Sequence, residues 1–211
     1  MHRADNNLEV RPSHWRICIP AQIVVLLCAV LFGSGEVKPA VAQDSAEEYQ
    51  IKAAFLFHFA QLVEWPAGAL NASDQSINVC IFNDEPRRKE LQTTIEGKSI
   101  GIRVLRVSML EQQQSIQGCN VLFLGREESR RQAAVLRCAR ELPVLTVGET
   151  DDFLLDGGMI QFHVDGDKIR FDINANVADS AHLKISSRLL LLATSVTHSA
   201  AKGPEKASYA H

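Results

Sequence analysis

Short apolar segments alternate with helical segments along most of the chain, and this order constrains the fold more than any other feature. Four segments rich in valine, isoleucine, leucine and phenylalanine have the length of buried strands, at residues 77–82, 100–107, 121–124 and 144–147. Apolar residues at helical spacing precede or separate them, at residues 45–63, 86–95, 109–116 and 127–140. The order predicts an α/β fold, with a mostly parallel sheet and helices on both faces.

The C-terminal part has a different pattern. Residues 159–164 and 168–173 alternate in hydrophobicity on either side of Asp165-Gly166-Asp167, and a glycine in such a turn favours a hairpin. We therefore expect an antiparallel hairpin at one edge of the sheet. One last helix is predicted over residues 178–196.

The spacing also predicts which side chains face the core. Ser45 can cap the first helix, with Glu48 three residues later as its capping-box partner. In the second predicted strand, we expect the side chains of Ile100, Ile102 and Val104 to lie on one face. The charged helix at 127–140 is expected to point three residues inward: Ala134, Val135 and Cys138.

The first 42 residues have the organisation of a secretory signal peptide. Arginines precede an apolar run at residues 23–32, and small residues ending in Ala40-Val41-Ala42 follow it. A run of ten residues is shorter than the roughly 20 that a membrane-spanning helix needs. We predict cleavage after Ala42, one folded domain over residues 43–198, and a mobile polar tail over residues 199–211.

Charge and motifs exclude several functional classes. The formal net charge of −3 argues against a surface for nucleic acid, which needs a clustered basic face. Gly97-Lys98-Ser99 lacks the earlier glycine of a phosphate loop and is interpreted as a turn. The sequence contains no recognisable catalytic, cofactor-binding or metal-binding motif, so we predict no catalytic residue, no cofactor and no metal ligand.

Isolated titratable residues leave a weaker alternative open. Glu64 and Asp172 lie in apolar settings, where burial would raise their pKa values and make them candidate acid–base groups. A solvated or hydrogen-bonded carboxylate is the favoured interpretation, and His58 is interpreted as a structural histidine. Catalysis would require the fold to bring these groups together with a histidine.

Three cysteines follow the leader, and sequence alone allows three pairings. Cys80 lies inside the first strand and Cys119 immediately precedes the third. If these strands are neighbours in the sheet, their Cβ atoms come within the roughly 4 Å that a disulfide requires. We therefore predict a Cys80–Cys119 disulfide and a buried, free Cys138, and we leave open that all three are core thiols or that Cys138 pairs between chains.

Seven motifs in order resemble the YfiR family of bacterial periplasmic proteins. The similarity covers residues 47–196. Its motifs are residues 49–59 with Glu64-Trp65-Pro66, Cys80 in its strand, Cys119 before 121–123, residues 145–147, residues 157–160, residues 169–174, and residues 183–190.

The resemblance implies a non-enzymatic periplasmic regulator. Known members repress a diguanylate cyclase of the inner membrane by binding its periplasmic sensory part, and an envelope lipoprotein can sequester the repressor. The family also implies that disulfides stabilise the fold and that a homodimer can form. A second disulfide found in the family does not carry over to this chain.

A repressor needs an exposed apolar contact patch, for which Trp65, Phe153 and Leu154 are the candidate residues. Packing of these three residues in the core is the alternative. A second functional hypothesis is a periplasmic sensor or binding module for a small ligand, with its crevice at the carboxyl ends of the parallel strands.

Overall fold

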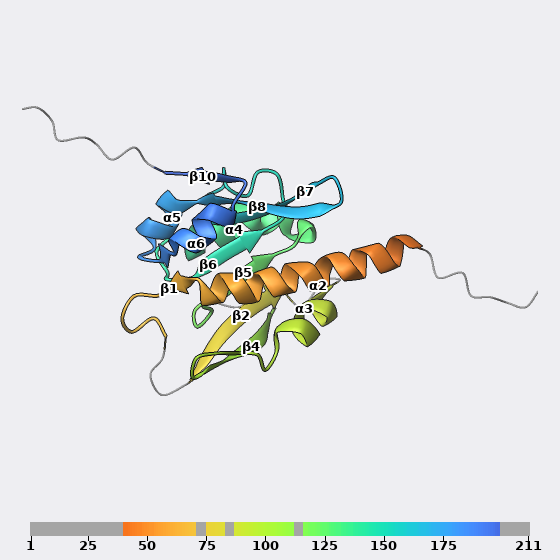
Figure 1. Cartoon of the computed structure of the whole chain (residues 1–211). Helices are drawn as coiled ribbons and strands as arrows, with labels where there is room; N and C mark the ends of the chain where they lie inside the picture. The colour runs from red at the N-terminus through yellow and green to blue at the C-terminus, as the bar shows by residue number, and fades with distance from the viewer. Residues whose placement is uncertain (1–39, 71–74, 83–86, 112–115, 199–211) are drawn as a thin grey trace, which may run out of the picture. The chain divides into compact units, whose positions relative to one another are not determined.

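The computed structural model describes residues 40–70, 75–82, 87–111 and 116–198 (Figure 1). The predicted tail at 199–211, and all of the predicted leader except its last three residues, lie outside the described residues. Within the described residues, no helix combines the length and hydropathy needed to cross a bilayer.

A mixed eight-stranded sheet organises the domain, in the order β10-β8-β7-β6-β5-β2-β4-β3. The pairs β4–β2, β2–β5, β5–β6 and β6–β7 are parallel, whereas β7–β8 and β3–β4 are antiparallel. The mostly parallel sheet is therefore as predicted. The strands are β2 (Ser76–Phe82), β3 (Ser99–Ile100), β4 (Arg103–Leu110), β5 (Val121–Leu124), β6 (Leu145–Gly148), β7 (Ile160–Asp165), β8 (Lys168–Asn174) and β10 (Ser195–Thr197).

The predicted hairpin is present, but it is not the outermost part of the sheet. Strands β7 and β8 pair over six residues, with Ile160 opposite Ile173 and Phe162 opposite Phe171. Strand β10 then adds in parallel to the free side of β8. The hairpin therefore lies one strand in from the edge, because the last described residues form a strand where the sequence predicted helix.

Helices cover both faces of the sheet, as predicted. Helix α2 (Ala40–Gln61) crosses one face (Figure 1), where it shares a core with α3 (Arg88–Ile95), α5 (Ala175–Ser180) and α6 (Ser187–Leu192). Helix α4 (Ser129–Ala139), preceded by the short 3-10 helix η1 (Arg126–Glu128), packs on the opposite face. In β2, side chains alternate between these two cores, because successive residues of a strand point to opposite faces.

Four aromatic rings join α2 to the hairpin. Phe55 and Phe59 on α2 contact Phe162 and Phe171 with ring centroids 5.0 to 5.9 Å apart. Such pairs contribute about 0.5–1.5 kcal/mol each beyond the area they bury. The helix is thereby held along the hairpin.

Three details of the N-terminal half differ from the prediction. Helix α2 begins at Ala40, so Ser45 lies inside the helix and is not its cap. Ile102 is 75% exposed in a turn between β3 and β4, and Leu105 occupies the core instead. Met109 and Leu110 continue β4, and residues 112–115 of the predicted helix lie outside the described residues.

The predicted final helix is divided in two by a turn at His182. Helix α5 ends in a Schellman motif, in which His182 N–H donates to Asp179 O (3.0 Å) and Leu183 N–H to Ala178 O (2.9 Å). His182 has a φ of 58° at the position where glycine is usual. Residues 184–185 then form strand β9 (Lys184–Ile185), and Ser186 caps α6 by accepting from Leu189 N–H.

Candidate functional site

A groove forms where two segments distant in sequence meet. After α2, strand β1 (Val63–Glu64) pairs antiparallel with β9, and Ser186 N–H donates to Leu62 O at 2.9 Å. This small sheet places the residues after Glu64 beside the end of α5. The resulting groove, of about 650 Å³, is called the Trp65 groove and is lined by Glu64, Trp65, Pro66, Ala67, Asp179, His182, Leu183 and Lys184.

Trp65, which lines this groove, also has an unpaired polar atom in its indole. Its Nε1 is shielded from solvent and has no hydrogen-bond partner among the described residues. A buried donor without an acceptor costs about 1–3 kcal/mol. A partner that displaces the indole and supplies an acceptor to Nε1 would recover that energy, so Trp65 is a candidate contact with a physical reason to bind.

His182 adds a second unusual feature to the same groove. A non-glycine residue in the left-handed region costs about 1–2 kcal/mol, and such conformations cluster at binding and catalytic sites. Its side chain is exposed, as are those of the neighbouring Asp179 and Lys184. The groove therefore combines an aromatic wall with charged and titratable groups at its rim.

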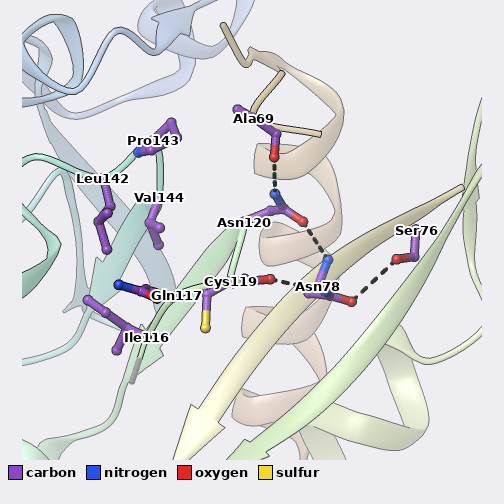
Figure 2. A pocket seen from close by; sticks show the side chains of 11 residues that line it. Ala69, Ser76, Asn78, Ile116, Gln117, Cys119, Asn120, Leu142, Pro143 and Val144 are labelled. Carbon is purple, nitrogen blue, oxygen red and sulfur yellow. Dashed lines mark hydrogen bonds between the residues drawn. The ribbon is translucent and has the colours of Figure 1, made fainter. Parts of the chain in front are cut away.

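A second cavity, of about 260 Å³, lies at the amino ends of β2, β5 and β6 (Figure 2). Two amides organise it: Asn120 Oδ1 accepts from Asn78 N–H at 2.8 Å, and Asn78 Nδ2 donates to Gly118 O at 3.0 Å. Cys119 forms part of its wall, and Ile116, Leu142 and Val144 supply apolar surface. Among the described residues that line this amide cavity, none is charged, so it suits a small neutral ligand with hydrogen-bonding groups.

The carboxyl ends of β5 and β6, where the sequence predicted a ligand crevice, hold a buried ion cluster. Lys52 of α2 and Glu149 are each 1% exposed, and Lys52 Nζ lies 3.2 Å from Glu149 Oε1. Lys52 also pairs with Glu48, and Tyr49 donates to Glu149 Oε2 at 3.0 Å. The more exposed Arg126 lies 3.7 Å from Glu149.

Sequence reasoning missed this cluster, although a signal was present. Lys52 lies on the same stripe of α2 as Leu56 and Phe59, at spacings of four and three residues, and these side chains are buried. A lysine on such a stripe must find an anion, because an unpaired buried charge is very costly. Glu149, directly after the buried strand β6, is that anion.

Burial raises the pKa of Glu149 above its ordinary value of 4.5, and the nearby Lys52, Tyr49 and Arg126 oppose the rise. Protonation of Glu149 therefore favours the folded state. The stability that this protonation contributes to the folded state is fully present below about pH 4.5. It is lost as the pH rises through the raised pKa of Glu149.

We expect this titration to appear in the difference between the wild-type protein and Glu149→Gln. Urea unfolding measured from roughly pH 4 to pH 8 should show the stability of the wild type relative to the variant decreasing as the pH rises. The exposed Glu127→Gln serves as the control and should show no such trend. A difference in the free energy of unfolding between the wild type and Glu149→Gln that does not change with pH would contradict the raised pKa of Glu149.

Residues 49–194 match the model of the YfiR/HmsC-like family. The chain belongs to this family. YfiR/HmsC-like proteins are periplasmic regulators of cyclic-di-GMP signalling, and they act on membrane signalling proteins.

Other comparisons are more distant. A conserved domain protein from Vibrio cholerae O1 biovar El Tor is 11% identical, over 71% of this chain and 60% of its own, with a TM-score of 0.49. The ABC domain from Streptococcus pneumonia, solved in complex with L-Trp, is 11% identical over 61% of this chain and 57% of its own, with a TM-score of 0.44. The chain thus spans less than two thirds of the length of either structure. No curated protein matches the sequence.

The cysteines that carried the family resemblance form a disulfide. Strand β5 lies directly beside β2, and the Cα atoms of Cys80 and Cys119 are 5.7 Å apart. Cys138 is free, as predicted, but exposed. The prediction of an inward Cys138 was wrong because α4 instead buries Gln132, Leu136 and Ala139.

The three predicted contact residues have different environments. Trp65 is half-buried and lines the groove described above. Leu154 is half-buried against the α4 core. Phe153 is 0% exposed, and its ring fills the space that a Cβ on Gly148 or Gly158 would need. Phe153 is therefore a core residue in this conformation and cannot serve as a surface contact, and the two glycines are explained by packing.

The fold separates the two candidate carboxylates. Glu64 is exposed in β1 and lines the Trp65 groove. Asp172 belongs to the large sheet, where it accepts from Ser195 Oγ at 2.7 Å and lies 3.1 Å from His163 Nδ1. These contacts join β7, β8 and β10, so Asp172 has a structural role. In the described part of the chain, no cluster of three histidine, cysteine or carboxylate side chains has the geometry to hold a metal ion.

Proposed function

We propose that this protein is a non-enzymatic periplasmic repressor that binds the periplasmic sensory part of an inner-membrane diguanylate cyclase through the Trp65 groove. Membership of the YfiR/HmsC-like family supports the class of partner. The unpaired Nε1 of Trp65, beside a strained His182, is the observation that supports the place of contact. An envelope lipoprotein that competes for the same groove would release the cyclase.

Repression by binding follows from linkage. A repressor shifts a cyclase toward its inactive conformation only by binding that conformation more tightly than the active one. A 100-fold shift needs a difference of about 2.7 kcal/mol. One recovered hydrogen bond to Trp65 and a few apolar contacts give a difference of this size when they form only with the inactive conformation.

Deletion of the gene should raise cellular cyclic-di-GMP, and the wild-type gene should restore the low level. Trp65→Phe keeps an aromatic side chain but removes the Nε1 donor together with part of the indole, so we expect weaker repression with little change in protein stability, since relief of the unpaired donor offsets the lost packing. His182→Gly removes a groove side chain and relieves the positive φ, so it should be about 1 kcal/mol more stable and also repress less well. Cyclic-di-GMP levels and thermal unfolding measure both effects.

Leu155→Ala is the matched control, because Leu155 is highly exposed yet lies outside the Trp65 groove. It should repress as the wild type does. Unchanged cyclic-di-GMP on deletion would contradict the proposed function. Full repression by both groove variants would instead contradict the proposed place of contact.

Export of the protein is part of the same proposal. Cleavage after Ala42 would remove the first three residues of α2 and leave Gln43 as the new amino terminus. Amino-terminal sequencing of the protein recovered from the periplasm should begin at Gln43. A precursor that stays in the cytoplasm at full length would contradict it.

The amide cavity supports a second candidate function, a sensor for a small neutral ligand. Its amides and its uncharged lining are the observation that favours this function. A ligand that binds the folded protein raises the melting temperature by mass action. A panel of neutral envelope metabolites, such as monosaccharides, should contain one that raises the melting temperature. A panel without effect at millimolar concentration argues against the sensor.

A further inference from the structure

The tip of the β7–β8 hairpin and the first half of α2 form another groove, of about 530 Å³. Its lining combines aliphatic and acidic residues: Glu47, Glu48, Ile51, Val164, Gly166, Asp167 and Ile169. We call it the acidic groove. It shares no residue with the Trp65 groove or the amide cavity.

The aliphatic residues at the base of the acidic groove extend the apolar face of the hairpin beyond the part that α2 covers. Along the hairpin, three apolar pairs lie opposite one another on the face toward α2: Ile160–Ile173, Phe162–Phe171 and Val164–Ile169. The first two pairs are buried beneath α2. By contrast, Val164 is 51% exposed, and Ile51 on α2 is 44% exposed. These β-branched side chains are already rigid, so an apolar side chain that covered them would gain burial at little entropic cost.

The charge of the groove determines which charged groups a bound segment must have. Of the described residues that line the groove, three are carboxylates and none is a lysine, arginine or histidine. Glu48 is engaged by Lys52, whereas the exposed Glu47 and Asp167 face the groove from opposite walls. Within the described residues, the carboxylates do not converge closely enough to hold a metal ion. Separated anions on either side of an apolar floor fit separated cations on either side of an apolar side chain.

We propose that the acidic groove binds a short basic segment of a partner protein, with an aliphatic residue between flanking lysines or arginines. The proposal goes beyond the proposed repression of the cyclase, because it assigns a second contact surface. From Glu48 to the end of α2 at Gln61 the helix rises ~20 Å, so the two grooves lie near opposite ends of one rigid element. One protein molecule therefore has room for a segment in each groove.

The test uses the full mature protein and a fluorescent eight-residue peptide, with two arginines on each side of a central leucine–valine pair. Fluorescence anisotropy at low salt should show saturable binding with Kd below about 1 mM, weakened by raised salt. Glu47→Gln with Asp167→Asn removes two exposed pairs and should weaken binding about five-fold. Val164→Thr keeps the shape of the floor but makes it polar, and should weaken binding about three-fold.

Matched controls separate this site from overall charge and from the Trp65 groove. Glu127→Gln with Glu141→Gln removes the same charge from exposed positions outside the groove and should bind as the wild type does. A peptide with glutamates in place of the arginines should not bind, and Trp65→Phe should leave peptide binding unchanged. Absence of saturable binding up to 1 mM, or equal effects of the two double variants, would overturn the proposal without bearing on repression.

Discussion

Replacement of both Cys80 and Cys119 by alanine is expected to lower the free energy of unfolding by about 4 kcal/mol. The bond joins residues 39 apart in sequence, and a cross-link restricts the unfolded chain more when it closes a longer loop. Both cysteines are buried between neighbouring strands. Because domains are commonly stable by only 5–15 kcal/mol, this single change would remove a large part of the stability. Denaturant unfolding under non-reducing conditions measures it.

Cys138→Ser provides the control for this prediction. Cys138 is free and exposed on α4, so its replacement should change stability by less than about 0.5 kcal/mol. Reductant should destabilise the wild type and leave the double alanine variant unchanged. A double variant within about 1 kcal/mol of the wild type would show that the disulfide is not a main source of stability.

Lys52→Met is expected to destabilise the protein by about 3–5 kcal/mol. The methionine fills most of the volume of lysine, but it leaves the carboxylate of Glu149 buried without its nearest cation. Tyr49 and the partly exposed Arg126 still contact Glu149, which keeps the expected loss from being larger. Urea unfolding at neutral pH measures the change.

Two comparisons identify the cause of that loss. Adding Glu149→Leu to Lys52→Met removes the unpaired buried carboxylate and should restore much of the stability. Replacing a buried ion pair by apolar side chains often changes stability little. Lys89→Met on α3, an exposed lysine, should have little effect. A Lys52→Met protein as stable as the wild type would show that Glu149 does not depend on Lys52.

The architecture was largely predictable because it follows from local patterns. Buried strands show as short apolar runs, and the hairpin shows as alternation around a glycine turn. Adjacency of the first and third strands was the condition for the predicted Cys80–Cys119 disulfide, and β2 and β5 are neighbours joined by that bond. Family membership was predictable for the same reason, since its motifs are these core segments.

Polar residues in the core account for the clearest errors. In α4, Gln132 is buried because Thr150 Oγ1 donates to its Oε1, and its own Nε2 donates to Asp156 Oδ2 at 2.8 Å. These bonds fix the face that α4 turns inward and leave Cys138 in solvent. A sequence pattern counts glutamine as a surface residue, so it predicts a different face. The break at His182 was missed for another reason, because the left-handed turn that ends α5 usually contains glycine.

By itself, the sequence determined most of the elements, their order along the chain and the family to which it belongs. Only the tertiary structure decided what the surface can bind. Pairing of β1 with β9 brings Trp65 beside His182, packing of α2 joins Lys52 to Glu149, and the hairpin tip faces Glu47 across a groove. The physical reason is that hydrophobic periodicity reports how each segment contacts the core, whereas a binding surface depends on which distant segments that core places side by side.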